Sequence, residues 1–351
     1  MRPWTCRGEG VDPDALVRHR TDIVINAPLH TVWKVQSLVA LPATAAGRSA
    51  TDRTAPDQSA PQARALEKFS LVVLPDTQYS AESFPQAFSA QGKWIKENTV
   101  ARNIKYAIHE GDIVDDSDRP SQWANATGAL GQLNGATPYI LAVGNHDMDA
   151  MPKGQNPVVV RDAAAFNCHF PRSAFATLPS FGGSYPAAQN DNSFHVFSAG
   201  GTNWLILALK YAPTDDEIAW GNKVISDHPD RQVMIVTHAY QNGMTKDSVG
   251  QKLWNKMVSR HPNVSMVFSG HYVNQGVIVE KGVGGNTVHQ IQADYQNPGT
   301  LGPNSYLRIL EFNPTAKTVS VQTYSPYLNK NLTDAKNQFT LQNVSFPHAR
   351  R

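Results

Sequence analysis

Cysteine is almost absent from this chain, since the 351 residues include only Cys6 and Cys168. Two distant cysteines do not make the disulfide framework that stabilises small secreted domains, although one long-range bridge stays open. The same scarcity argues against a zinc site built from several thiolates and against a catalytic thiol. Cysteine use by itself leaves the cellular compartment open.

Long apolar runs and an excess of one charge are missing too. A run such as Trp204 to Leu209 ends after about six residues, whereas a transmembrane helix needs roughly 20. The formal net charge is only +2, so we expect neither a nucleic-acid partner nor a polybasic membrane anchor. No charged and then apolar leader opens the chain, which favours a soluble, cytoplasmic protein without an ordinary signal peptide. The oligomeric state is left open.

The composition, with 41% apolar and 17% charged residues, is that of a globular protein with room for one large domain and a tail. Residues 42–67 contain few large apolar side chains and many Ala, Thr, Ser and Pro, which predicts a flexible linker. We therefore expect an N-terminal fragment at 1–41, this linker, and a main domain at 68–345.

The N-terminal fragment contains one recognisable stretch. Thr21 to Val35 resembles the opening strand and helix of polyketide-cyclase-like (START-type) proteins. The remaining strands of that fold have no room before the main domain begins, which favours a vestigial fragment or a leader. An alternative is a binding module for an apolar ligand.

Short, continuous apolar runs alternate with helix-spaced apolar residues along the main domain, which predicts an α/β fold with buried parallel strands. After His271 the pattern changes to strands alone, separated by Gly- and Pro-bearing turns, and predicts a second, partly antiparallel sheet. The expected strands are Phe69–Leu74, Ile104–His109, Pro138–Val143, Phe194–Ser198, Trp204–Leu209, Gln232–Thr237, Val264–Phe268, Val277–Glu280, Val288–Ala293, Tyr306–Phe312 and Thr318–Tyr324.

Polar residues follow several of these strands directly. Ligands of α/β sheets gather at the carboxyl ends of strands, so we expect these side chains to meet at one rim. Carboxylate, amide and imidazole groups together suit a pair of divalent metal ions. The segments are Asp76-Thr77-Gln78, Gly111-Asp112-Ile113-Val114-Asp115, Gly144-Asn145-His146-Asp147, His238 and Gly270-His271.

The order and content of these segments resemble the calcineurin-like metallophosphoesterase superfamily, over roughly Leu71 to Tyr324. Its pattern is Asp-x-His, Gly-Asp-x-x-Asp, Gly-Asn-His-Asp/Glu, a lone His and Gly-His-x-His. The resemblance implies two facing mixed β-sheets with helices outside, a four-layer α/β-β/α sandwich. It also implies a metal-dependent hydrolase of phosphomonoesters or phosphodiesters, in which a metal-activated water attacks phosphorus.

The site residues follow from this resemblance position by position. Asp112 matches the carboxylate that bridges two divalent ions, whose identity among Mn, Fe, Zn and Mg stays open. His146 matches the catalytic residue that faces the phosphate and helps the leaving group depart, with Asp147 orienting it and Asp115 bracing the Asp112 loop. Asn145, His238 and His271 match the other ligands of one ion, and Asp76 and Gln78 match those of the second.

Each of these side chains also has a structural interpretation. Asp76 at a strand end suits a turn or helix cap, and His238 after an apolar run suits a buried structural histidine. The order of the whole series favours the ligand interpretation. His109, His195 and His289 lie inside expected strands, and we assign them structural roles.

Two positions depart from the family pattern, and both weaken the same metal position. Gln78 offers an amide oxygen in place of an imidazole, and Val273 offers no ligand atom where the motif has its last His. Asn274 is a candidate replacement, although a continuing strand would turn it to the other face. One consequence is an asymmetric two-metal enzyme. The alternative is a mononuclear or non-catalytic phosphate-binding member of the same fold.

Substrate determinants are few. Tyr79, Tyr240 and Tyr272 lie beside predicted ligands and suit either stacking on an organic group or plain packing. Arg and Lys do not gather near the motifs, which favours a small phosphate ester over a polyanion. Met148 to Ser193, rich in Pro, Gly and Asn, is expected to form a cap over the site.

Overall fold

The computed structural model describes residues 66–148, 162–296 and 305–347. These residues all belong to one structural unit. The predicted N-terminal fragment 1–41 and nearly all of the linker 42–67 lie outside the described residues, and so does Cys6. The predicted boundaries of the fragment, the linker and the main domain therefore stay predictions.

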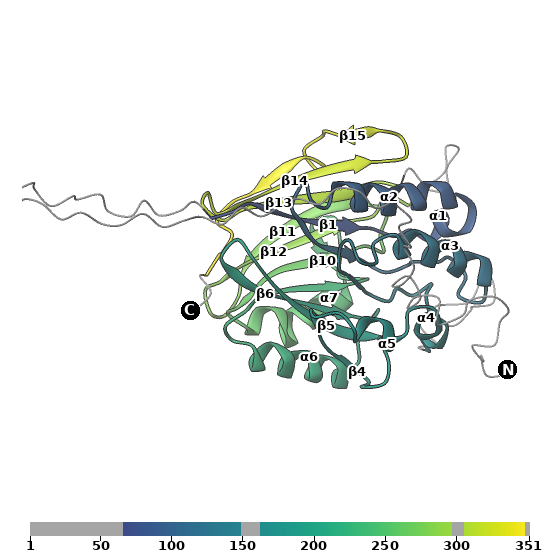
Figure 1. The fold of residues 1–351 in the computed structure, drawn as a ribbon. Helices are drawn as coiled ribbons and strands as arrows, with labels where there is room; N and C mark the ends of the chain where they lie inside the picture. Colours follow the sequence, from purple (N-terminus) through teal and green to yellow (C-terminus); the bar gives the residue numbers. More distant parts are fainter. Residues whose placement is uncertain (1–65, 149–161, 297–304, 348–351) are drawn as a thin grey trace, which may run out of the picture. The chain divides into compact units, whose positions relative to one another are not determined.

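Two mixed β-sheets form the centre of the fold (Figure 1). In the first sheet, β1 pairs in parallel with β2 and β2 with β3, whereas β1 pairs antiparallel with β13 on its other side. The order of this sheet is β15 (Lys330–Leu332), β14 (Thr318–Ser325), β13 (Leu307–Asn313), β1 (Phe69–Leu74), β2 (Ile104–His109) and β3 (Tyr139–Leu141), with β16 (Phe339–Leu341) also pairing with β14.

The second sheet contains a parallel centre, in which β6, β7, β10 and β12 run in the same direction. Its order is β11 (Gln275–Lys281), β12 (Thr287–Ala293), β10 (Val264–Ser269), β7 (Gln232–Thr237), β6 (Thr202–Leu209), β5 (Asn192–Ala199) and β4 (Phe181–Tyr185). A small hairpin, β8 (Gln241–Asn242) with β9 (Thr245–Lys246), stands apart from it.

The two sheets face each other across a shared apolar core. Leu71 and Val73 of β1 lie in this core with Met234 and Val236 of β7, whereas the alternate residues of β1 face the other way. Period-two alternation lets one strand line two layers at once. The rings of Phe69 and Trp204, which come from different sheets, have centroids 5.9 Å apart.

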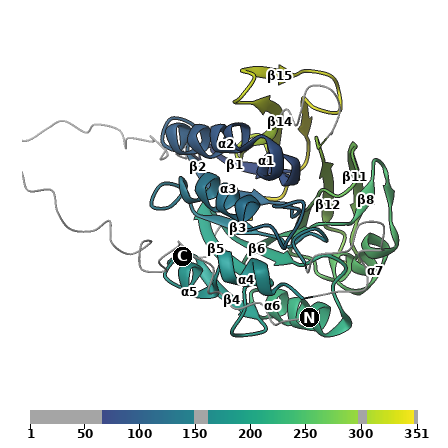
Figure 2. The same cartoon turned by 90° about the vertical axis from the view of Figure 1, so that its right-hand side faces the viewer.

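Helices cover the outer faces. The helices are α1 (Gln78–Ser83), α2 (Pro85–Asn98), α3 (Pro120–Gly131), α4 (Ala164–His169), α5 (Arg172–Phe175), α6 (Asp215–Asp227), α7 (Ser248–Lys256) and the 3-10 helix η3 (Val258–Arg260). Figure 2 shows α2 and α3 beside β1 to β3, and α6 and α7 on the side of the second sheet. The expected four-layer α/β-β/α arrangement is thus confirmed.

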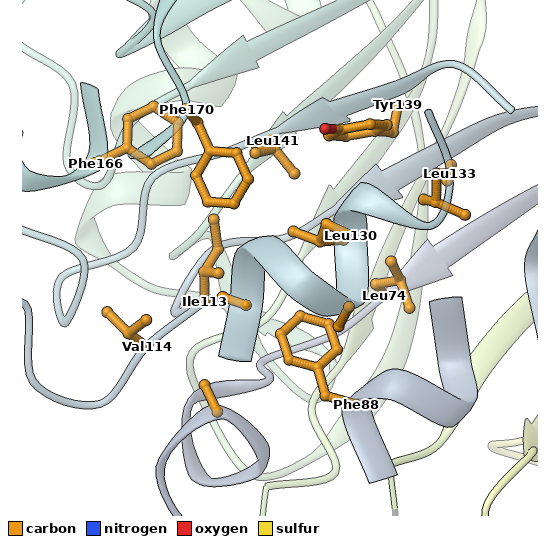
Figure 3. Packing of buried hydrophobic residues seen from close by; sticks show 14 of the residues in the cluster. Leu74, Phe88, Ile113, Val114, Leu130, Leu133, Tyr139, Leu141, Phe166 and Phe170 are labelled. Carbon is orange, nitrogen blue, oxygen red and sulfur yellow. The ribbon is translucent and has the colours of Figure 1, made fainter. Parts of the chain in front are cut away.

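The core under α2 and α3 also fixes a loop of the candidate site. Phe88 of α2 and Leu130 of α3 pack with Leu74 of β1, and Ile113 and Val114 join them from the loop after β2 (Figure 3). Both loop residues are fully buried. Because Asp112 directly precedes them, its backbone is held by this core.

All the strands expected from the sequence are present, mostly within two residues at either end. A second, partly antiparallel sheet is present, but the strands after His271 divide between the two sheets. β11 and β12 extend the second sheet, whereas β13 and β14 cross to the first and pair with β1. Local alternation identifies a strand, but the choice of partner depends on contacts distant in sequence.

Part of the segment expected to form a cap, Met148 to Ser193, is described, and several of its side chains pack into the core. Phe166, Phe170 and Phe175 of the α4–α5 segment are buried in the core shared with α3, and the Trp123 and His169 rings stack 5.2 Å apart. This part of the segment therefore packs as core. Residues 149–161 lie outside the described residues, and among the described helices none is long and apolar enough to cross a membrane.

Candidate metal centre

The predicted site residues meet at the carboxyl ends of parallel strands from both sheets. Asp76 follows β1, Asp112 follows β2 and Asn145 comes after β3. His238 directly follows β7, and His271 lies two residues beyond the end of β10. Neighbouring parallel strands present their carboxyl ends along one edge, so facing sheets bring these loops together.

Three side chains form the centre of this group. One ligand atom from each of Asp112, His238 and His271 lies within 4.8 Å of the others. His238 Nε2 is 3.0 Å from Asp112 Oδ2 and 3.2 Å from His271 Nδ1. The three atoms therefore converge on one point, as ligands of a single cation do.

A hydrogen bond to the backbone fixes the orientation of the His238 ring. Its Nδ1 lies 3.1 Å from the Glu110 carbonyl oxygen, which can only accept, so Nδ1 donates to this oxygen and Nε2 faces Asp112. Such outer contacts commonly set the tautomer of metal-binding imidazoles. Tyr211 and Tyr272 pack against the His271 ring with centroids 5.4 and 4.5 Å away.

Several buried oxygens of the other predicted ligand residues have no hydrogen-bond partner. They are Asp76 Oδ1, Gln78 Oε1 and Asn145 Oδ1. All three residues are less than 9% exposed. A buried acceptor without a donor is costly unless a ligand completes it. Oxygen acceptors beside two imidazoles are the donor set of a divalent cation site, so these residues fit the metal ions that the sequence implies.

Glycines allow the ligands to approach the backbone. A Cβ on Gly144 would lie 2.0 Å from Asp112 Oδ1, and one on Gly270 would lie 2.1 Å from Asp76 Oδ1. Asp112 and His271 themselves adopt positive φ angles of 49° and 71°. Non-glycine residues in this region are uncommon and concentrate at functional sites.

Asp115, and not Asp147, holds the His146 imidazole. His146 Nδ1 lies 2.7 Å from the Asp115 carbonyl oxygen and 3.3 Å from its carboxylate. The buried Asp147 carboxylate instead accepts from the backbone N–H groups of Ile113, Val114 and Gly144 at 2.7, 3.1 and 2.8 Å. The predicted roles of the two aspartates are therefore exchanged, because Asp147 joins two loops.

Burial and neighbouring charges strongly shift the pKa values of ionisable groups in the centre. Burial, with the Asp294 and Asp112 carboxylates, raises the pKa of Asp76 well above its ordinary value. Burial also works against ionisation of Asp112, but the adjacent His238 imidazole outweighs it and lowers the pKa of Asp112. Burial and His238 lower the pKa of His271 to about 4, so its ring is a neutral potential ligand near neutral pH.

A structural histidine ties two of the loops together. His109 Nδ1 accepts from the Gly111 N–H at 3.1 Å, so Nε2 carries the proton and donates to Thr77 Oγ1 at 2.9 Å. Thr77 in turn donates to the Ile113 carbonyl at 3.1 Å. This chain links the Asp76 loop to the Asp112 loop and supports the structural role expected for His109.

The two departures from the motif differ in their surroundings. Gln78 is only 1% exposed, whereas Val273 is 61% exposed. The Asn274 amide donates to Asn242 Oδ1 at 3.0 Å, which takes it away from the centre. Tyr240 is fully buried and donates to Gln290 Oε1 at 2.7 Å, so it packs as core.

Three further residues lie at this rim, and sequence reasoning missed two of them, Gln296 and Tyr211. Asp294 and Gln296 follow β12 and lie against Asp76, and Tyr211 follows β6 and contacts both histidine rings. None belongs to a recognisable motif. Their position just beyond the carboxyl ends of parallel strands is the signal that would have found them.

Comparison with known proteins identifies the family. The model of the calcineurin-like phosphoesterases matches residues 69–275. That is more than half of the chain, which therefore belongs to the calcineurin-like phosphoesterase family. Members of this family act on phosphoesters and usually bind divalent metals.

The comparisons also give individual relatives. The uncharacterized protein YvnB of Bacillus subtilis (strain 168) is 37% identical over 292 residues, which cover 79% of this chain and 22% of YvnB. The chain thus spans about a fifth of that relative's length.

Among solved structures, purple acid phosphatase PPD1 of yellow lupin (Lupinus luteus) has a TM-score of 0.49 at 14% identity, covering 79% of this chain and 54% of its own. The calcineurin-like phosphoesterase YfkN of Bacillus subtilis has a TM-score of 0.41 at 9% identity, covering 78% and 88%.

Proposed function

We propose that this protein is a metal-dependent hydrolase of phosphoric esters with an asymmetric two-ion site. The observation that supports it best is the convergence of Asp112, His238 and His271 beside buried oxygens that lack donors. In this proposal Asp112 would be shared by both ions, Asn145, His238 and His271 would hold one of them, and Asp76 and Gln78 would hold the other. Bound ions would supply an activated water and stabilise the oxygens of an in-line displacement at phosphorus.

His146 is the proposed catalytic side chain. Its backbone N–H donates to Asp112 Oδ1 at 3.0 Å, which fixes it beside the bridging carboxylate. Its Nδ1 is hydrogen-bonded to the Asp115 carbonyl oxygen, and its side chain is 37% exposed. The second ring nitrogen is thus the one left to help a leaving group depart, by proton donation or charge stabilisation. Asp147 acts as a positioning residue for the two loops.

The proposed substrate is a small phosphomonoester or phosphodiester. Lys210, which follows β6 near the rim, is engaged in ion pairs with Asp191 at 3.1 Å and Glu217 at 2.9 Å. The site therefore relies on metal ions to neutralise phosphate charge. A long polyanion would call for additional cationic side chains along its path.

Hydrolysis after controlled metal loading tests this function. The full chain is stripped of metal, reloaded with Mn, Zn, Fe or Mg, and assayed with chromogenic mono- and diesters. We expect metal-dependent turnover, and a loss of about 10²- to 10⁴-fold in kcat for His146→Ala. As a matched control, His289→Ala removes a histidine outside the centre and should leave turnover unchanged. Absence of hydrolysis with all four metals would contradict the proposal.

A second candidate is a mononuclear or non-catalytic phosphate-binding protein, which the exposed Val273 and the neutral Gln78 favour. It predicts at most one ion per chain by elemental analysis and unchanged ligand binding in His146→Ala. Two bound ions with metal-dependent turnover would exclude it.

A further inference from the structure

One half of the proposed centre lacks a protein ligand. Val273 has an aliphatic side chain, 61% exposed, where the family motif has its last imidazole. An ion held by Asp76, Gln78 and Asp112 alone would have only three protein ligands. The environment of Asp76 indicates which residue completes it.

Asp294 reaches this point from the neighbouring strand. β10 and β12 run in parallel, with Ser269 opposite Gln292. Beyond these strand ends, both segments contact Asp76: the His271 N–H donates to Asp76 Oδ2 at 2.8 Å, and the Gln296 amide nitrogen lies 3.4 Å from the same oxygen. The segment after β12 thus brings the acidic side chain of Asp294 close to Asp76.

The contacts of Asp294 lead to Asp76. Asp294 is fully buried, and its carboxyl group lies within hydrogen-bonding range of the Asp76 carboxyl. The Gln296 amide nitrogen spans both, 2.9 Å from Asp294 Oδ2 and 3.4 Å from Asp76 Oδ2. The Gln296 backbone N–H donates to Asp294 Oδ1 at 2.7 Å and fixes the orientation of that carboxylate.

Oxygens without partners lie at the same place. Asp76 Oδ1 and Gln296 Oε1 have no hydrogen-bond partner, and both side chains are more than nine-tenths buried. Rotation of the Gln296 amide exchanges its nitrogen for its oxygen and presents another neutral acceptor to the carboxylates. Acceptors facing acceptors are stabilised only when something positive lies between them.

The hydrogen bonds of the buried cation Arg308 go to other acceptors. Arg308 donates from Nε to the Tyr295 hydroxyl at 2.9 Å and from Nη1 and Nη2 to the Gln292 and Lys336 carbonyls at 3.0 and 2.9 Å. The donor shared by the Asp76 and Asp294 carboxylates is the neutral Gln296 amide, which leaves their negative charge for a bound cation to neutralise.

We propose that Asp294 is a ligand of the ion held by Asp76, Gln78 and Asp112, and takes the place of the missing imidazole. This inference rests on the two-ion site proposed above. The protein ligands at this position are then all oxygens, whereas the other position has two imidazoles. Oxygen ligands favour hard ions, so this position should prefer Mn²⁺ or Mg²⁺ over Zn²⁺.

Metal binding to the metal-free full chain tests the proposal without an activity assay. Elemental analysis after dialysis and calorimetric titration with Mn²⁺ should give two ions per wild-type chain. In Asp294→Asn, which keeps the acceptor for the Gln296 N–H, one ion should bind more than about tenfold more weakly while the other is unchanged. Asp247→Asn removes a charge at the same rim and still caps α7, so it should bind two ions normally.

The outcomes separate this inference from the proposed function. Two ions bound with wild-type affinity by Asp294→Asn would overturn the inference and leave the hydrolase proposal intact. A single ion in the wild type would overturn it too, and the hydrolysis assay would then decide the function independently.

A wild-type crystal soaked in Mn²⁺ serves if the variant does not fold. Its anomalous peak should lie within about 2.0–2.6 Å of the Asp294 carboxylate, and a second peak farther away than this would overturn the inference.

Discussion

At the scale of single residues, His195 shows how burial alone makes a side chain sensitive to pH. It lies on β5 between aromatic rings, with the Tyr106 hydroxyl against Nδ1 and no partner at Nε2. Burial lowers its pKa from 6.5 to about 3, so the folded protein binds this proton less readily than the unfolded chain. Its contribution to stability is complete above pH 6.5 and is lost progressively as the pH falls toward 3.

Replacement of His195 should change how steeply the free energy of unfolding depends on pH. Between pH 6 and 4, His195→Gln should flatten the decline of the free energy of unfolding, by up to about 1.4 kcal/mol per pH unit. Urea unfolding at several pH values measures this. Tyr106→Phe keeps the burial and should keep the slope. An unchanged slope in His195→Gln would refute the assignment.

At the scale of elements, α6 has the most complete start signal in the described chain. Thr214 accepts from the Glu217 N–H at 3.3 Å, and Glu217 accepts in return from the Thr214 N–H at 2.7 Å. This capping box satisfies two donors that the first turn leaves open. The buried face of α6, including Ile218 and Ile225, then covers the second sheet.

Removal of the cap should therefore cost stability without changing the site. We expect Thr214→Ala to lower the free energy of unfolding by about 1 kcal/mol, and Thr214→Ser to lower it by much less. Chemical denaturation gives both values. Equal losses in the two variants would show that the methyl group of Thr214, and not its hydroxyl, matters.

At the scale of the whole molecule, the described residues form an extensive core. Its three apolar clusters draw on residues between Phe69 and Phe346, and the described strands of both sheets come from the same span. We propose that this part, predicted as the domain 68–345, folds without the N-terminal fragment. Deletion of residues 1–65 should leave the melting temperature and metal stoichiometry unchanged. A marked fall in melting temperature would assign the fragment a structural role.

The sequence alone determined the local features of this protein. Continuous apolar runs identified the strands, and the motif segments after them identified Asp112, His238 and His271 as neighbours. Such features depend on residues close together in the chain. Strand periodicity and the rule that functional loops lie at carboxyl ends were sufficient to predict them.

The tertiary structure decided which distant segments meet. Gln296 contacts Asp76 across 220 residues, and β13 and β14 join the first sheet instead of forming their own. Asp115 and Asp147 exchange roles because side-chain direction depends on how each loop is packed. These outcomes arise from long-range packing and hydrogen bonding, for which neighbouring residues in the chain contain no signal.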